Sequence, residues 1–284
     1  SLKVEAIKVA KKADLVLFVG GLNKSHSQDC EGNDRTQFNL PFNQDKLIND
    51  IYNVNKNIGL ILVSGNAVEM PWLDKVNGIV QSWYLGSMAG HAIADVISGD
   101  VNPSGKLPFT FPKRLKDNSA HYFGELSYPG DSINQYYKDD ILVGYRWHDT
   151  KKIEPLFEFG FGLSYSDFKL SQFSANNNSF SSEEEIKISC TVKNTGDMDG
   201  SEVVQVYVGK PKSKVERATK ELKGFAKTFV KKGESNTVNI EIPVSALAFY
   251  DESISDWNIE KGDYIIYIGN SSKHICKKIK INVK

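Results

Sequence analysis

The stretch that decides the fold of the first part of the chain is Leu15-Val16-Leu17-Phe18-Val19-Gly20-Gly21. Five consecutive apolar residues followed by two glycines are typical of a strand that is buried on both faces and ends in a tight turn. Two further apolar runs follow, at 59–64 and 78–83. Helical stripes lie between and after them: Leu47, Ile48, Ile51 and Tyr52, then Ala89, Ile93, Val96 and Ile97. Alternating strands and helices predict a mainly parallel sheet with helices on both faces, an α/β sandwich.

A polar loop follows Gly21 and precedes a helix that we predict near Gln44. The loop is rich in charge, with Asp29, Glu31 and the Asp34-Arg35 pair. Because α/β proteins place binding groups at the carboxyl ends of their strands, this loop is a candidate site for acid–base chemistry.

From about Asp167 the periodicity of the sequence changes from helical to alternating. Apolar residues occupy every second position in the runs 186–192, 204–208, 238–242, 264–268 and 279–283. Turn sequences such as Asn194-Thr195-Gly196-Asp197 separate these runs. This pattern predicts an all-β sandwich of antiparallel strands. We therefore expect two domains, 1–166 and 167–284.

Composition excludes some classes of partner. The 284 residues are 40% hydrophobic and 25% charged, and the formal net charge is zero. We expect no nucleic-acid partner and no membrane partner, because no basic surface or long apolar span is encoded. Three cysteines make no disulfide framework, and Cys190 and Cys276 fall in apolar strand patterns, so we expect both to be buried. The five histidines show no zinc-like spacing, and we expect no metal.

Three long motifs carry a resemblance to a known family. The first is Glu31-Gly32-Asn33-Asp34-Arg35 running into Leu40-Pro41, the second covers 82–90 and 102–112, and the third covers 143–147 and 155–165. In this order they resemble the C-terminal catalytic-site domain of family 3 glycoside hydrolases. The remainder resembles the fibronectin-III-like domain that follows it in many members.

The resemblance implies a retaining, exo-acting β-glycosidase, of the β-glucosidase or β-xylosidase type. It implies that Glu31 is the general acid/base and that the nucleophile is an Asp on an N-terminal (β/α)8 barrel, which these 284 residues do not contain. We therefore interpret the chain as a fragment that is inactive alone. The implied substrate is a β-linked oligosaccharide or an aryl glycoside, the implied partner is the barrel of the same protein, and no cofactor is needed. Read from the residues alone, Glu31 is more simply a surface or ion-paired loop glutamate.

Other loop residues are weaker candidates. We expect Asp34 and Arg35 chiefly to support the loop, since the planar guanidinium fixes carboxylates and carbonyls. Asn23, His26 and Gln28 are candidates for binding sugar hydroxyls. The Ser255-Asp256-Trp257 triplet resembles the setting of the family's nucleophile, but it lies in the predicted sandwich. We interpret it as a coincidental match and expect Trp257 to be a core residue.

A second hypothesis is a non-catalytic carbohydrate-binding or scaffolding protein. The segment 122–147 is dense in aromatic residues, which can stack on sugars. We expect an exposed apolar or aromatic patch around this segment and the Glu31 loop, through which the chain could form a homo-oligomer.

Overall fold

The computed structural model describes residues 2–25 and 27–284, with the side chains of residues 33 and 34 excepted. The chain forms two compact units. The first runs up to Asp95 and includes Pro112–Leu115, and the second comprises Val96–Phe111 and Lys116–Lys284. These units are defined by compactness, whereas the predicted division at 166/167 follows the sequence pattern and stays a prediction.

The first unit is built on a parallel sheet, as predicted. Its strands are β1 (Val16–Gly21), β4 (Ile58–Val63) and β5 (Gly78–Gln81), in the order β1-β4-β5. The pairings described for this sheet are all parallel, with Val16 opposite Ile58 and Gly59 opposite Gly78. The carboxyl ends of the three strands therefore lie at one edge of the sheet.

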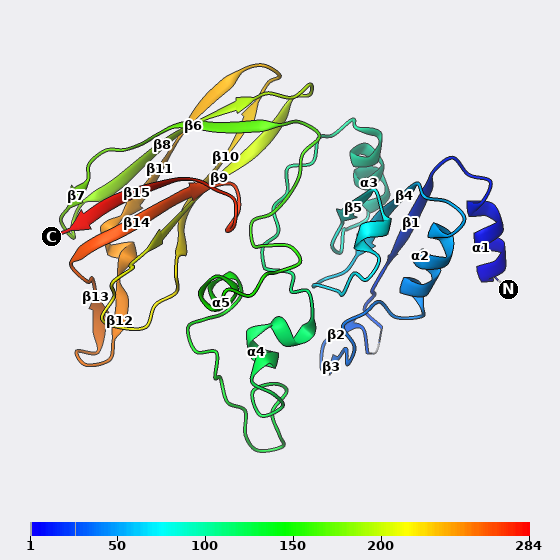
Figure 1. Ribbon diagram of the computed structural model, residues 1–284, viewed down its shortest axis with the longest axis horizontal. Coiled ribbons are helices and arrows are strands. Elements are labelled where there is room, and N and C mark those ends of the chain that lie inside the picture. Colours follow the sequence, from blue (N-terminus) through cyan, green and yellow to red (C-terminus); the bar gives the residue numbers. More distant parts are fainter. Residues whose placement is uncertain (1, 26) are drawn as a thin grey trace. The chain divides into compact units, whose positions relative to one another are not determined.

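Helices α1 (Leu2–Ala10) and α2 (Gln44–Tyr52) pack beside β1 and β4 (Figure 1). Ala10 of α1 and Ile51 of α2 form a small core with Ile58, and Val16 and Phe18 of β1 pack against it. Ile58 is fully buried, which contributes about 1.5–3 kcal/mol to the stability of the fold. After β5 the chain passes through α3 (Ala89–Ser98), which ends as predicted at a glycine, Gly99.

One face of β1 is more exposed than predicted. Leu15, Leu17 and Val19 are 48%, 48% and 65% exposed, although the apolar run predicted cover on both faces. The reason is the twofold alternation of a strand. Helices α1 and α2 cover the face that carries Val16 and Phe18, while Leu17 and Val19 point to the opposite face at an edge strand.

A short 3-10 turn, Leu73–Lys75, lies between β4 and β5. The segment between the sheet and the sandwich is mostly irregular. It contains α4 (Ser119–Tyr122) and α5 (Tyr145–Lys151), with a short 3-10 turn at Leu115–Asp117. Trp147 is almost fully buried and its Nε1–H donates to the Asp117 carbonyl over 3.1 Å. The Tyr145 hydroxyl accepts from the Leu222 N–H over 2.8 Å, so α5 is tied to the sandwich of the second unit.

The remainder is the predicted β-sandwich (Figure 1). One sheet has the order β10 (Glu221–Val230), β9 (Gly200–Gly209), β14 (Gly262–Gly269), β15 (Ile275–Val283), β7 (Ser179–Phe180). The other has the order β11 (Ser235–Pro243), β8 (Glu185–Asn194), β6 (Phe168–Ala175). Their inward residues form one large core, which includes Ile186, Val192, Val206, Ile240 and Ile266. The 3-10 turn Val244–Leu247 leads into a separate hairpin of β12 (Phe249–Asp251) and β13 (Asp256–Asn258).

Two burial predictions in the sandwich are wrong. Trp257 is 67% exposed, because it lies on the β12–β13 hairpin outside both sheets, where it makes an edge-to-face contact with Tyr250. Cys276 is exposed because the inward positions of β15 are the odd-numbered ones, such as Ile281. Cys190 is buried as predicted.

Candidate functional site

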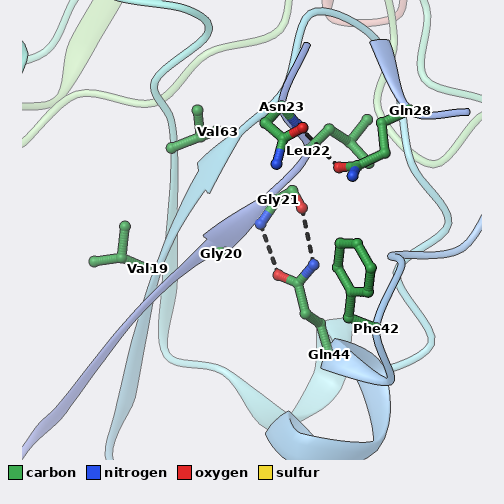
Figure 2. A pocket seen from close by; sticks show the side chains of 9 residues that line it. All are labelled: Val19, Gly20, Gly21, Leu22, Asn23, Gln28, Phe42, Gln44 and Val63. Atoms are coloured by element: carbon green, nitrogen blue, oxygen red, sulfur yellow. Dashed lines mark hydrogen bonds between the residues drawn. The ribbon is translucent and has the colours of Figure 1, made fainter. Parts of the chain in front are cut away.

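The candidate loop leaves the sheet at Gly21, the last residue of β1 (Figure 2). Its φ is 138°, and a Cβ there would lie 1.9 Å from the Val63 carbonyl oxygen, so only glycine fits. The side-chain amide of Gln44 holds this residue from the start of α2. Gln44 Oε1 accepts from the Gly21 N–H over 2.8 Å, and Nε2 donates to the carbonyls of Gly21 at 2.8 Å and Pro41 at 3.1 Å. These bonds fix the direction in which the loop departs.

The first residues of the loop bond mainly to one another. Gln28 is buried and its Oε1 accepts from the Asn23 N–H over 3.1 Å. Asn23 Oδ1 accepts from the Ser25 N–H over 2.7 Å. We predicted from the sequence that both side chains bind sugar hydroxyls. In the structure, the side-chain amide oxygens of Asn23 and Gln28 accept hydrogen bonds from the backbone of the loop. His26, the third candidate, lies outside the described residues.

A shallow depression lies beside this part of the loop (Figure 2). It has a volume of about 350 Å³ and a mostly apolar lining that includes Val19, Phe42 and Val63. Phe42 is 78% exposed. Phe42 is one exposed aromatic side chain in this region, and an apolar patch around the Glu31 loop stays a prediction.

Glu31 sits at the tip of a very short hairpin. Its strands are β2 (Asp29–Cys30) and β3 (Asn33–Asp34), and Glu31 and Gly32 form the turn between them. Gly32 has a φ of 71°, the left-handed value that a glycine in the second turn position provides. Glu31 is exposed, so its carboxyl is available to a group outside the hairpin.

Asp29 anchors the hairpin on its first strand. Its carboxylate accepts three hydrogen bonds, from the Gly65 N–H at 2.8 Å, the Asn66 Nδ2 at 2.9 Å and the Tyr84 hydroxyl at 2.6 Å. Gly65 and Asn66 follow β4, and Tyr84 follows β5. The carboxyl ends of three neighbouring strands therefore meet at this one side chain.

Arg35 anchors the hairpin on its other side. Its Nη2 donates to Asn66 Oδ1 and to the Ala67 carbonyl, each over 2.9 Å. Burial lowers the pKa of Arg35 from its ordinary value, while the nearby Asp29 raises it. Arg35 thus contacts the loop after β4, and its loop-supporting role stays a prediction. Asp34 is paired in backbone register with Asp29, and a role for its side chain stays a prediction.

The aromatic segment of the second unit is only partly exposed. Tyr122 is 57% exposed and Tyr137 is 79% exposed, as we expected for this segment. Tyr145 and Trp147, at its end, are instead buried. Exposed aromatic side chains therefore occur mainly before α5.

Two kinds of feature are absent from the described residues. Within residues 2–25 and 27–284, no helix is long and apolar enough to cross a membrane. Across the same residues, no three His, Cys, Asp or Glu side chains gather as a metal-binding group.

Residues that sequence reasoning missed are Gly65, Asn66 and Tyr84, the partners of Asp29. A signal for them exists: each lies just beyond the carboxyl end of a predicted strand, where loops of a parallel sheet converge. What the sequence could not give is the pairing of particular donors with one carboxylate.

The chain thus combines an α/β unit, which presents a carboxyl on an anchored loop, with a β-sandwich. Comparison with known families identifies this combination. Residues 1–165 match the glycosyl hydrolase family 3 C-terminal domain, and residues 202–272 match the fibronectin type III-like domain. The chain belongs to glycosyl hydrolase family 3.

Its relatives include enzymes named as β-glucosidases. Over 275 residues the chain is 51% identical to "Beta-glucosidase BoGH3A" of Bacteroides ovatus, covering 97% of this chain and 37% of that protein. It is 43% identical to "Thermostable beta-glucosidase B" of Acetivibrio thermocellus, covering 98% of this chain and 36% of that protein. The chain therefore spans about a third of the length of these curated relatives.

Solved structures show the same fold. The Bifidobacterium adolescentis GH3 β-glucosidase superposes with a TM-score of 0.92 at 37% identity, covering 99% of this chain and 41% of that one. The Kluyveromyces marxianus β-glucosidase in complex with glucose gives 0.90 at 38% identity, covering 99% and 33%.

Proposed function

We propose that this chain supplies the general acid/base, Glu31, to the active site of a retaining, exo-acting β-glucosidase. The observation that carries the proposal is the placement of Glu31. It lies at the exposed tip of a two-residue turn, on a hairpin anchored to the carboxyl edge of a parallel sheet, within the Glu-Gly-x-Asp-Arg motif of the family. The names of the relatives favour β-glucosides over β-xylosides as substrates.

In this proposal Glu31 acts twice. Its carboxylic acid protonates the departing glycosidic oxygen, and the resulting carboxylate then removes a proton from the water that hydrolyses the glycosyl-enzyme. A retaining mechanism also needs a nucleophilic carboxylate about 5–5.5 Å from the acid/base. We assign that group to the (β/α)8 barrel of the full-length protein. No cofactor takes part.

The other loop residues have supporting parts in the proposal. Arg35 and Asp34 hold the hairpin. Asn23 and Gln28 shape the preceding loop and offer their amide nitrogens to sugar hydroxyls, and His26 keeps its proposed role in sugar contact.

The test uses the full-length enzyme and two substrates that differ in their need for acid catalysis. Glu31→Ala should hardly slow glycosylation by a dinitrophenyl β-glucoside, because that leaving group departs unprotonated. An alkyl β-glucoside should lose about 10²–10⁴-fold in kcat/KM. Glu5→Ala is the matched control, since Glu5 is an exposed glutamate of the same unit, on α1. Equal losses on both substrates would remove Glu31 from the acid/base role.

The non-catalytic alternative makes a different prediction. A carbohydrate-binding or scaffolding chain would bind an oligosaccharide through exposed aromatic residues such as Tyr137, and a full-length protein would show no turnover. Titration calorimetry of the 284-residue chain with cellobiose, beside turnover by the full-length protein, separates the two functions.

A further inference from the structure

The Glu31 hairpin cannot hold its own shape. It consists of two strands of two residues each, and its described pairs are Asp29 with Asp34 and Cys30 with Asn33. An isolated two-stranded hairpin is marginally stable in water even when it is much longer. The position of Glu31 therefore depends on what holds the two strands from outside.

The strongest external contact is made by Asp29. This side chain lies two residues before Glu31, about 7 Å along an extended strand. A carboxylate can accept about four hydrogen bonds, and Asp29 accepts three, from Gly65, Asn66 and Tyr84. The 2.6 Å bond from the Tyr84 hydroxyl is the shortest of the three and joins the hairpin to the segment after β5.

Gly65 shows how closely these groups are packed. A Cβ at this position would lie 3.0 Å from Tyr84 Cε2 and 3.2 Å from Asp29 Oδ2. Any side chain at position 65 would therefore press against both partners, and a glycine lets the ring and the carboxylate approach the β4 loop.

The Tyr84 hydroxyl stays protonated and can therefore donate its hydrogen bond at neutral pH. Burial raises the pKa of Tyr84 above its ordinary value, and the hydrogen bond to Asp29 raises it further. The phenol therefore keeps its proton throughout the neutral and mildly alkaline range.

We propose that Tyr84 and Asp29 form a positioning pair for the Glu31 carboxyl, in which the phenol holds Asp29 and Asp29 holds the turn. This inference rests on the proposed function, because it assigns the pair to the proton transfer made by Glu31. Neither residue touches the reacting atoms. Their effect is to keep the acid where the leaving oxygen needs it.

The test is Tyr84→Phe in the full-length enzyme, which removes one oxygen atom and its hydrogen bond. Tyr52→Phe is the matched control, because Tyr52 is a half-buried tyrosine of the same unit whose ring lies under Lys56. Misplacing a catalytic group by about 1 Å can cost about 10²-fold. We expect Tyr84→Phe to lower kcat on an alkyl β-glucoside by about 10- to 100-fold and on a dinitrophenyl β-glucoside by less than about 3-fold. Tyr52→Phe should leave both substrates unchanged.

A second background separates positioning from general damage. In Glu31→Ala enzyme, Tyr84→Phe should cause no further loss, because the group that it positions is gone. Asp29→Asn, a variant of nearly identical shape, should repeat the pattern if Tyr84→Phe folds poorly. Equal losses with and without Glu31, or no loss at all, would overturn the pair's role while leaving Glu31 as acid/base. Failure of the proposed function is read separately, from Glu31→Ala alone.

Discussion

Gln44 offers a stability prediction that can be worked from the structure in detail. Its amide makes three hydrogen bonds, one accepted from the Gly21 N–H and two donated to the carbonyls of Gly21 and Pro41. Each bond between neutral groups contributes about 0.5–1.5 kcal/mol net, so the loss of all three in Gln44→Ala should cost about 1.5–4.5 kcal/mol. Gln44→Glu should cost more at neutral pH, because one carboxylate oxygen would face two carbonyl oxygens and no donor.

The assay is hydrogen exchange across β1 and the start of the loop, since unfolding of a two-unit chain need not be a single transition. In Gln44→Ala, the protection of the amides of residues 16–23 against exchange should fall by the amount that corresponds to the lost stability. Gln37→Ala is the control, because Gln37 is an exposed glutamine of the same unit. If Gln44→Ala and Gln37→Ala agree within about 0.5 kcal/mol, the usual range of surface substitutions, the reasoning about this amide is refuted.

Three further predictions concern other parts of the chain. The isolated 284-residue chain should not hydrolyse nitrophenyl β-glucoside or β-xyloside above background, and turnover that vanishes in Asp256→Ala would show that the Ser-Asp-Trp triplet is functional after all. Asp45→Ala should cost about 1–3 kcal/mol by chemical denaturation, because Trp72 Nε1–H loses its 2.6 Å acceptor. Burial raises the pKa of Asp45, so the folded state favours the protonated carboxyl. Asp45→Asn keeps the acceptor oxygen, so its stability relative to the parent protein should increase as the pH rises above the ordinary aspartate pKa of about 3.9. A stability difference that stays constant across pH would contradict this. Gly160→Ala should lower the melting temperature of the second unit, since φ is 80° and the new Cβ would lie 2.2 Å from Gln205 Oε1; an unchanged melting temperature would refute that steric argument.

The fold was predictable to the extent that periodicity reports burial. The three parallel strands and α2 lie close to their predicted positions, as do the five alternating strands of the sandwich. Strand β10 was not predicted, because its outward positions carry Phe225 and Phe229, 67% and 54% exposed, which obscure the alternation. Leu17 and Val19 show the opposite failure, in which an apolar run predicted burial but the residues are exposed. The run does not show which face of the strand other elements cover.

For the candidate site, the sequence predicted only residues that are close to one another in the chain. Glu31 and Arg35 stand out in one short motif; Glu31 lies in the turn of the hairpin, and Arg35 directly follows its second strand and contacts the loop after β4. Tyr84 lies 55 residues from the Asp29 carboxylate that it contacts, and no local pattern links them. Long-range hydrogen bonds of this kind form where loops meet at the edge of a sheet. The sequence predicts which loops meet there, but not which of their residues form hydrogen bonds with one another.

The central claim, that Glu31 is the acid/base of a retaining enzyme, is tested most directly by azide rescue of full-length Glu31→Ala on a dinitrophenyl β-glucoside. Without the carboxylate, water attacks the glycosyl-enzyme slowly, whereas azide needs no general base. Added azide should therefore restore turnover, and nuclear magnetic resonance should identify the product as β-glucosyl azide. No acceleration by azide, or an azide product of α configuration, would contradict it.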